Sequence, residues 1–314
     1  MDRREFLKAL AVTGVAASLK IVGGEELLAQ TAKNVSTKQT VDLVAIMGSE
    51  PDIMFRRAIA EMGGIGKFVK KNHKVCVKPN IGWDKAPELA ANTNPKLVAE
   101  IIKQCLAAGA KEVVVFDHTC DEWTKCYKNS GIEAAAKKAG AKVLPGNDES
   151  YYREAALMKG KVLKTAKIHS AILDSDVWIN VPILKHHGGA NMSLAMKNHM
   201  GICWDRRIFH NKDLQQCIAD ICTLDKRPVL NVIDGYRLLK QNGPQGKSEA
   251  DVVDAKALFM SQDIVAVDTA AVKFFNSAAK INVPLEHVGH IACGQALKLG
   301  TMNIDNINIK RIKL

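Results

Sequence analysis

Chemically versatile side chains are concentrated in one short stretch of the sequence, ILKHHGGANMSLAMKNHMG, at positions 183–201. The stretch holds three of the nine histidines of the chain and two of its lysines, around a pair of glycines. Imidazoles serve as general acids, general bases and metal ligands, and ammonium groups neutralise phosphate or carboxylate. Such a stretch is either a binding or catalytic site or a chance feature of surface composition, and its surroundings must decide between the two.

The spacing within this stretch predicts an anion-binding loop followed by a helix. We expect a strand to end at Pro182, a tight turn at the two glycines, and a helix over about 190–202, on which Lys197 follows Ser193 by one turn. Unpaired backbone N–H groups at a helix start attract anions. The ligand-binding candidates of the stretch are Lys185, Gly188, Gly189, Lys197 and Asn198.

His186 and His187 are the candidate general acid or base of this loop. Neighbouring side chains of an extended segment point in different directions, so we do not expect both to bind one ion. The alternative is structural: surface histidines, with a lysine whose stem lies along the helix.

Polar residues recur where other predicted strands end. Lys78 and Asn80 follow one apolar run, Asp117 and His118 follow the next, and Asp234 follows RPVLNVID. In open α/β sheets, ligands bind beyond the carboxyl ends of the strands. Lys78 and Asn80 therefore join the ligand-binding candidates, and Asp117 and Asp234 join the two histidines as candidate catalytic residues.

Two loops supply further candidates. KPNIGWDKAPELAANTNP, at 78–95, is long enough to be functional, and Thr93 and Asn94 either bind a ligand or cap the helix that begins at Pro95. NGPQGKSE, at 242–249, lacks the spacing of a phosphate-binding loop. Its Gly243 and Gly246 indicate either a lid over a ligand or a tight surface turn.

Two aspartates lie in the helix predicted at 263–275, and each can be interpreted from its position in that helix. Asp263 is placed to cap the helix that follows it. Asp268 lies inside that helix among apolar residues, where an unpaired carboxylate is costly, so we expect it to pair with a lysine or bind something.

Strands and helices alternate along the chain. Predicted strands lie at 41–47, 73–80, 111–117, 141–145, 176–183, 227–235, 256–260 and 306–314, and predicted helices at 51–64, 95–109, 131–139, 190–202, 213–224, 263–275 and 287–299. The pattern from 147 to 175 is ambiguous. Alternation with continuously apolar strands predicts an α/β fold: a mostly parallel, Rossmann-like sheet with helices on both faces and a site at the carboxyl ends of the strands.

The composition argues against nucleic acid as a partner. The 314-residue chain has 44 Lys+Arg against 33 Asp+Glu, a net charge of +11, yet its lysines are scattered along predicted helices and aromatics make up only 5%. Base-stacking surfaces need interleaved aromatic residues. The basic surplus therefore suits an anionic small molecule, or simply solvated lysine-rich helix faces.

The N-terminus resembles a twin-arginine export signal. Arg3 and Arg4 precede Phe6, Leu7 and Lys8 and a short, weakly apolar run. We expect a signal segment at 1–30, a linker at 31–40, export to the periplasm or beyond through the twin-arginine machinery, and membrane contact only through this segment. The alternative is an amphipathic N-terminal helix.

The eight cysteines are expected to be mostly small buried residues. There is no C-x-x-C pair and no iron–sulfur cysteine run, so no cofactor is predicted from them. Cys120 and Cys126, which flank a polar loop, are the pair to test for a disulfide.

Taken in order, VCVKPN…TNP, INVPILKHH…LAMKNHMG, VIDG…GPQG and SQDIVAVDTAA resemble the DUF362 family, a domain of unknown function that is sometimes fused to ferredoxin modules. The resemblance covers most of residues 41–314, which we expect to be one DUF362-like domain. It implies an α/β fold and a set of motif positions, but no reaction.

Three classes of function follow from these residues. The first is an exported enzyme that acts on a phosphate- or carboxylate-bearing small molecule through lysine, histidine and aspartate. The second is a metal-dependent hydrolase or redox protein with His and Asp ligands, and the third is a ligand-binding or cofactor-handling protein without turnover. Neither the metal nor any other cofactor is specified by the sequence.

Overall fold

The computed structural model describes residues 40–314. The predicted signal segment, 1–30, and all of the linker 31–40 except Thr40 lie outside the described residues. No helix in the described part combines the length and the apolar character needed to cross a membrane.

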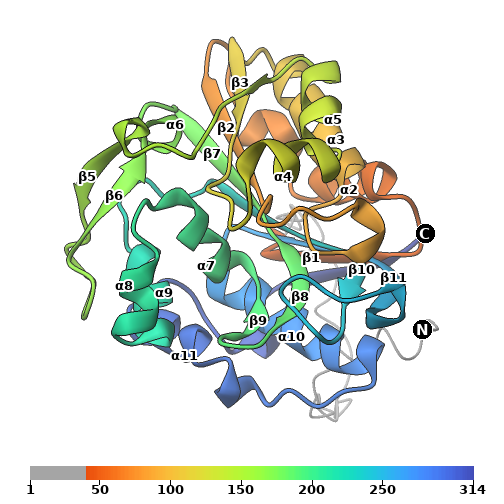
Figure 1. Cartoon of the computed structure of the whole chain (residues 1–314). Coiled ribbons are helices and arrows are strands. Elements are labelled where there is room, and N and C mark those ends of the chain that lie inside the picture. Colours follow the sequence, from red (N-terminus) through yellow and green to blue (C-terminus); the bar gives the residue numbers. More distant parts are fainter. Residues whose placement is uncertain (1–39) are drawn as a thin grey trace, which may run out of the picture.

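The core of the molecule is a ten-stranded mixed sheet (Figure 1). Its main path runs β12-β1-β11-β10-β7-β2-β3-β4, and β8 and β9 branch from β10. Every neighbouring pair on this path is parallel except those that β11 makes with β1 and β10. The strands are β1 (Leu43–Met47), β2 (Lys74–Pro79), β3 (Glu112–Val115), β4 (Lys142–Val143), β7 (Val177–Val181), β8 (Ile183–His187), β9 (Asn191–Ser193), β10 (Leu230–Leu239), β11 (Val252–Ser261) and β12 (Ile309–Lys313).

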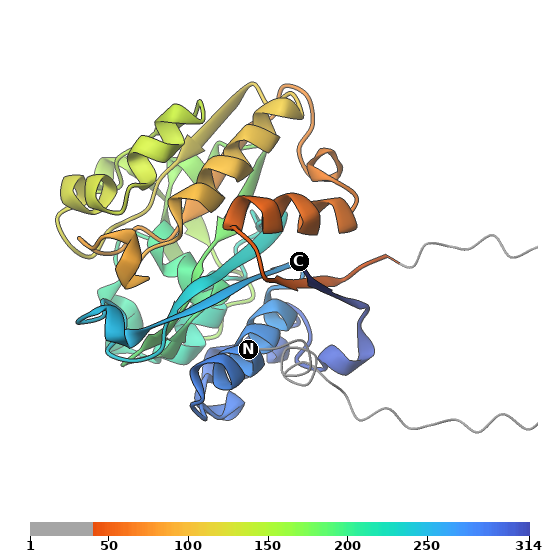
Figure 2. The same cartoon turned by 90° about the vertical axis from the view of Figure 1, so that its right-hand side faces the viewer.

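Helices cover both faces of this sheet, and the predicted α/β class is confirmed. One face packs against α2 (Pro51–Glu61), α3 (Pro95–Ala107), α4 (Trp123–Asn129) and α5 (Ile132–Lys138), and the other against α7 (Ala195–Asn198), α9 (Leu214–Ile221), α10 (Ile264–Ala279) and α11 (Gly289–Ala296). Alternate residues of β1 enter the two cores, Val44 and Ile46 on one side and Leu43 and Ala45 on the other. Figure 2 shows β1 beside the C-terminal strand β12, with α2 and α10 on opposite sides.

The ambiguous region between 147 and 175 contains a separate two-stranded antiparallel sheet, β5 (Tyr152–Ala156) with β6 (Thr165–His169). It stands out from the side of the molecule (Figure 1). Two short helices, α6 (Ser170–Leu173) and α8 (Arg207–Asn211), complete the α-helices of residues 40–314. The 3₁₀ turns are η1 (Ile65–Lys67), η2 (Pro87–Leu89), η3 (Glu149–Tyr151), η4 (His199–Ile202), η5 (Glu249–Asp251), η6 (Leu285–His287) and η7 (Ile304–Asn306).

Two predicted helix starts are confirmed by their caps. The Asn94 side chain accepts from the backbone N–H of Lys96, and Pro95 occupies the first turn of α3. Asp263 accepts from the N–H groups of Val265 and Ala266 at the start of α10. Each cap satisfies N–H groups that the helix itself leaves unpaired.

The predicted helix over 190–202 is wrong in its first turn. Residues 183–193 form a hairpin instead: β8 pairs with β9 in a register that places Lys185 opposite Ser193. β8 also lies parallel to β10, so sheet pairing overrides the local preference for a helix. Helical structure starts only at Ala195, and Ser193 therefore does not share a helix face with Lys197.

The prediction that Asp268 pairs with a lysine is also wrong. Its carboxylate accepts from the backbone N–H groups of Ala195 (2.7 Å) and Met196 (2.9 Å). The side chain is fully buried, and this burial raises the pKa of Asp268 to about 8. The helix N-terminus that was expected to bind an anion is therefore occupied by the side chain of Asp268 from α10.

One buried carboxylate connects the segment before β6 to α9. Asp220 accepts from the backbone N–H groups of Lys161 (2.9 Å), Val162 (2.6 Å) and Leu163 (2.8 Å). Gln216 donates to the same side chain. Three adjacent amides therefore depend on one buried carboxylate.

Replacing this carboxylate, Asp220→Ala, should lower the free energy of unfolding by about 2–4 kcal/mol, because it leaves buried N–H groups without acceptors. Denaturant unfolding of purified protein measures the loss. The exposed Asp225→Ala is the matched control and should leave the stability nearly unchanged. Equal stability of the two variants would contradict the assigned role of Asp220.

Candidate functional site

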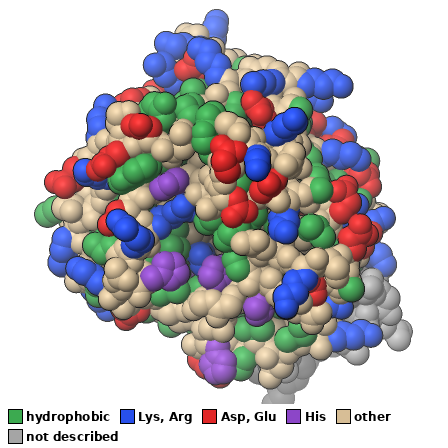
Figure 3. Space-filling model, in the orientation of Figure 1, with side chains coloured by type: hydrophobic (Ala, Val, Ile, Leu, Met, Phe, Trp, Pro, Cys, Tyr) green, Lys and Arg blue, Asp and Glu red, His purple; other side chains and the backbone are tan. Residues whose placement is uncertain are grey.

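A cleft of about 1020 Å³ opens beyond the carboxyl ends of β2 and β3. Its walls come from the loops after these strands, the β5–β6 sheet, the β8–β9 hairpin and residues 197–210. In Figure 3, lysine, arginine and histidine side chains gather around a hollow in the face of the molecule. Residues from several parts of the sequence thus enclose one space.

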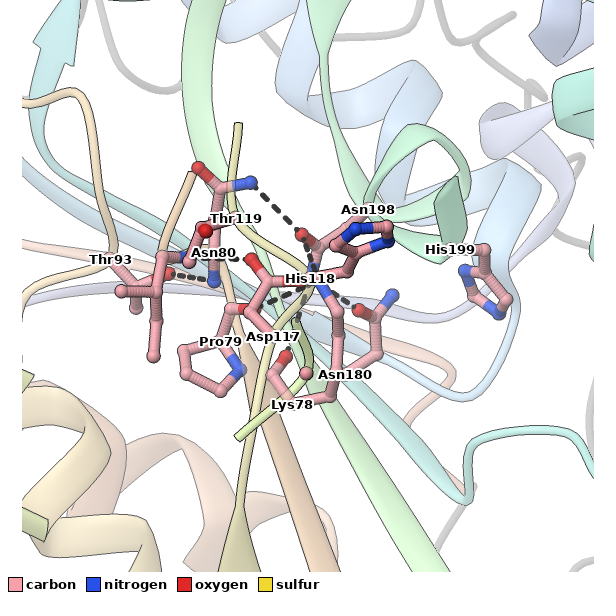
Figure 4. Close-up of polar contacts among 12 residues, drawn as sticks. Lys78, Pro79, Asn80, Thr93, Asp117, His118, Thr119, Asn180, Asn198 and His199 are labelled. Carbon is pink, nitrogen blue, oxygen red and sulfur yellow. Dashed lines mark hydrogen bonds and ion pairs between the residues drawn. The ribbon is translucent and has the colours of Figure 1, made fainter. Parts of the chain in front are cut away.

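A buried ion pair lies beneath the cleft (Figure 4). Lys78 Nζ lies 2.7 Å from Asp117 Oδ1, and both side chains are almost completely inaccessible to solvent. The same nitrogen donates to the carbonyl of Pro79 and to Asn198 Oδ1, each at 2.9 Å. Asp117 Oδ2 accepts from the N–H of Ile81. Both predicted site residues are thus committed to holding the ends of β2 and β3 together.

Asparagine side chains continue this network across the sheet. Asn198 Nδ2 donates to Asn180 Oδ1 at 2.8 Å, and Asn180 Nδ2 donates to Asn231 Oδ1 at 3.0 Å. Asn80 Nδ2 reaches Asn198 Oδ1 at 3.3 Å. A fully bonded polar network of this kind fixes the position of each member. It positions Asn80, which lines the cleft.

Gly201 approaches the ion pair more closely than any side chain would allow. A Cβ at this position would lie 2.0 Å from Asp117 Oδ1 and 2.6 Å from Lys78 Nζ. Gly201 is not among the site residues predicted from the sequence, although it ends the stretch 183–201. The sequence signal is a glycine near the end of the helix predicted over 190–202, and glycine is common at helix ends.

Lys185 is the buried cation that faces the cleft. It lies in β8 and donates to Asn80 Oδ1 at 3.0 Å and to the carbonyl oxygen of Ala91. Burial, and secondarily the charge of Lys197, lower the pKa of Lys185 to about 7. Lys197 is half-buried in the same cleft, and burial is the main cause that lowers its pKa to about 8.

Arg206 adds a third cation that the sequence analysis missed. Its guanidinium donates to the backbone carbonyls of His118 (2.9 Å) and Thr119 (2.6 Å) and to Cys120 Sγ (3.2 Å). It follows no strand, so the reasoning from strand ends could not find it. Within residues 40–314, Lys185, Lys197 and Arg206 form no ion pair with a carboxylate.

His118 and His187 line the cleft with opposite hydrogen-bonding roles. His118 Nδ1 lies 2.8 Å from the carbonyl oxygen of Cys203, so Nδ1 carries the proton and Nε2 of the neutral ring is an acceptor. His187 Nδ1 accepts from the N–H groups of Gly189 and Ala190, so Nε2 carries the proton. Burial lowers the pKa of both, that of His187 to about 2. The ring of His118 stacks on Trp204.

Several predicted site residues have structural contacts and do not line the cleft. Asp234 accepts from the N–H groups of Asn94 and Tyr236, and burial raises its pKa to about 6. It lies inside β10 because this strand continues to Leu239. Thr93 bridges the N–H of Asn80 and the carbonyl of Val181. Functional roles for Asp234, Asn94 and Thr93 stay predictions.

The two glycine pairs form turns beside the cleft. Gly188 and Gly189 join β8 to β9 on the surface, and Gly188 N–H donates to the carbonyl of Gly243. The N–H of Gly243 in turn donates to His186 Nδ1, so His186 contacts the 242–249 turn while its neighbour lines the cleft. Gly246 has a φ of 72°, a conformation that favours glycine.

In the described part of the chain, the cysteines form no disulfide and the potential metal ligands form no preformed metal site. Cys120 and Cys126 are both free thiols, the first exposed beside the cleft and the second buried. No group of three or more His, Cys, Asp or Glu side chains within residues 40–314 is arranged to hold a metal ion. Ammonium, guanidinium and imidazole groups are among the donors that line the cleft.

Gly201→Ala should destabilise the protein by about 1–3 kcal/mol, because the added methyl group overlaps the buried ion pair. Gly188→Ala is the matched control, since the nearest atom to its Cβ would be 3.9 Å away. Thermal unfolding compares the two. A melting temperature that is the same for both variants would show that the backbone at Gly201 is not confined by the ion pair.

Comparisons with known proteins give two distant similarities. It is 23% identical to "Thylakoid-associated protein sll1697" of Synechocystis sp. over 257 residues, which cover 74% of this chain and 78% of that protein. Among solved structures, the lactate racemase apoprotein from Thermoanaerobacterium thermosaccharolyticum matches with a TM-score of 0.44 and 13% identity. That match covers 69% of this chain and 54% of the racemase chain.

A family model matches the part of the chain that contains the cleft. Residues 75–273 match the family described as "Domain of unknown function (DUF362)", and this span includes both ends of the ion pair and all the cations and histidines of the cleft. The match extends over more than half of the chain, so the protein belongs to the DUF362 family.

Proposed function

We propose that the protein is an enzyme that binds a small molecule bearing a carboxylate or phosphate group in the cleft. The observation that carries this proposal is the set of three cations, Lys185, Lys197 and Arg206, that face one cleft without a carboxylate partner in the described residues. Burying an ammonium group without a counter-ion is costly. A bound anion supplies the missing charge.

The cations are held in place before a ligand arrives. Lys185 is fixed by Asn80, which is itself bonded to Asn198, and Arg206 is fixed by two backbone carbonyls. Donors that are already ordered lose little entropy when the anion binds. A ligand that excludes solvent from the cleft would also strengthen each charged contact, because charges interact more strongly in a medium of lower dielectric constant.

The histidine pair supports catalysis in addition to binding. His118 offers an unprotonated Nε2, which has no hydrogen-bond partner among residues 40–314, and His187 offers an Nε2–H. In our proposal His118 removes a proton from the bound substrate as general base, and His187 donates a hydrogen bond to the oxygen on which negative charge develops. In this proposal Asp117 has no direct part in the reaction and only supports the floor of the cleft.

The other two classes of function differ from this proposal in measurable ways. A binding protein without turnover would use the same cations but would not need the unprotonated nitrogen of His118. A metal-dependent hydrolase would need a ligand set, and no such set is preformed within residues 40–314. Neither alternative has an observation of its own in its favour.

We also propose that the protein is exported by the twin-arginine route. The support is the sequence alone: Arg3 and Arg4 followed by Phe6, Leu7 and Lys8. These residues lie outside the described structure.

Lys185→Met should weaken anion binding at least about tenfold, because it removes the buried ammonium. We would titrate the protein with malonate and with inorganic phosphate by calorimetry at low ionic strength. Binding should also weaken as the pH rises from about 6 to about 9, since pKa values of about 7 and about 8 mean that Lys185 and Lys197 lose their charge in this range.

The exposed Lys138→Met is the control for that experiment, and its affinity should equal that of the unchanged protein. Unchanged binding of both anions by Lys185→Met would overturn the proposed site. So would a protein that binds neither anion at any pH tested.

Export should fail when Arg3 and Arg4 are both replaced by lysine, because the paired arginines are the recognised feature of the signal. Cell fractionation of the full chain fused to a folded reporter measures this. Replacement of Arg56 and Arg57, the adjacent pair in α2, by lysine is the matched control and should leave export unchanged. Export that survives loss of the first pair would contradict the signal assignment.

A further inference from the structure

Lys197 differs from the other cations of the cleft because it has no oxygen acceptor. Its Nζ lies 3.6 Å from Met200 Sδ, and a thioether sulfur is a weak acceptor. No carboxylate or carbonyl oxygen within residues 40–314 accepts a hydrogen bond from it. By contrast, Lys185 donates to two oxygen atoms. The Nζ atom of Lys197 is therefore not held in place by a hydrogen bond to an oxygen atom of the described residues.

The surroundings of Lys197 make its neutral form easier to reach than that of an exposed lysine. It lines the cleft beside Arg206, and buried Lys78 lies beneath the same floor. Burial, together with the smaller effect of the charges of Arg206 and Lys78, lowers the pKa of Lys197 to about 8. A desolvated lysine beside other cations is an arrangement that makes the amine a nucleophile.

We propose that Lys197 forms an imine with a carbonyl compound that also carries an anionic group. This inference rests on the proposed function, because Lys185 and Arg206 would hold the anionic group while the carbonyl carbon lies against Lys197. The substrate class is therefore narrowed to anionic aldehydes and ketones.

The step balances without an oxidant or a reductant. The Nζ lone pair of Lys197 attacks the carbonyl carbon, a C–N bond forms, and the carbonyl π electrons move to oxygen. The C–O bond then breaks, and the oxygen leaves as water with the two protons that the amine gives up.

The two histidines of the cleft suit this exchange of protons. His187 Nε2–H can donate a hydrogen bond to the carbonyl oxygen as charge develops there, and His118 Nε2 can accept a proton from the attacking amine. Both rings line the same cleft as Lys197.

The test is reductive trapping of the full chain with succinic semialdehyde, an anionic aldehyde, and sodium cyanoborohydride. Peptide mass mapping should find a 3-carboxypropyl group on Lys197, formed at least about tenfold faster than on the exposed Lys138. Butanal, which has the same number of carbon atoms but no charge, should show a clearly smaller preference for Lys197, because it cannot use the cations of the cleft. Lys197→Arg keeps the positive charge but should lose the fast labelling.

Labelling of Lys197 that is no faster than that of Lys138 would overturn the inference. Equal preference for Lys197 with butanal would overturn its anionic part. Malonate titration of the same sample separates this failure from that of the proposed function. If malonate binds and Lys197 is not labelled, only the imine is lost. If malonate does not bind, the anion site is lost as well.

Discussion

The ion pair between Lys78 and Asp117, with 2.7 Å between Nζ and Oδ1, fixes the geometry on which the cleft depends. It joins the ends of β2 and β3 at the point where parallel strands leave the sheet. The cost of burying both charges is offset by hydrogen bonds from Ile81 and to Asn198, so neither charge is left partly solvated. Gly201 is confined by the same pair, and this brings residues 197–206 over the cleft.

Charge in the cleft is divided into two layers with different roles. The lower layer, Lys78 with Asp117, is neutral as a pair and structural. The upper layer, Lys185, Lys197 and Arg206, is cationic and has no carboxylate partner in the described residues. In the proposed function, a site built this way would bind an anion without losing its rigidity, because the supporting pair does not have to move when a ligand enters.

Part of this site was predictable from the sequence, because strand ends mark where ligands gather. Strand ends predicted Lys78, Asp117 and Lys185 as one group, and in the structure Lys78 and Asp117 form an ion pair beneath the cleft that Lys185 lines. Features that depend on long-range contacts were not predicted: the 183–193 hairpin depends on pairing with β10. The role of His118 depends on a carbonyl 85 residues away, at Cys203. Contacts between residues that are far apart in the sequence produce no periodicity and no local motif from which they could be predicted.

The most direct test of the cationic cleft is the location of a bound anion in a crystal. We would grow crystals at about pH 6, where both cleft lysines are charged, and soak them with selenate for an anomalous difference map. The account predicts a peak within hydrogen-bond distance of Lys185 Nζ, shared with Lys197 or Arg206. Peaks at other surface lysines with an empty cleft would contradict it.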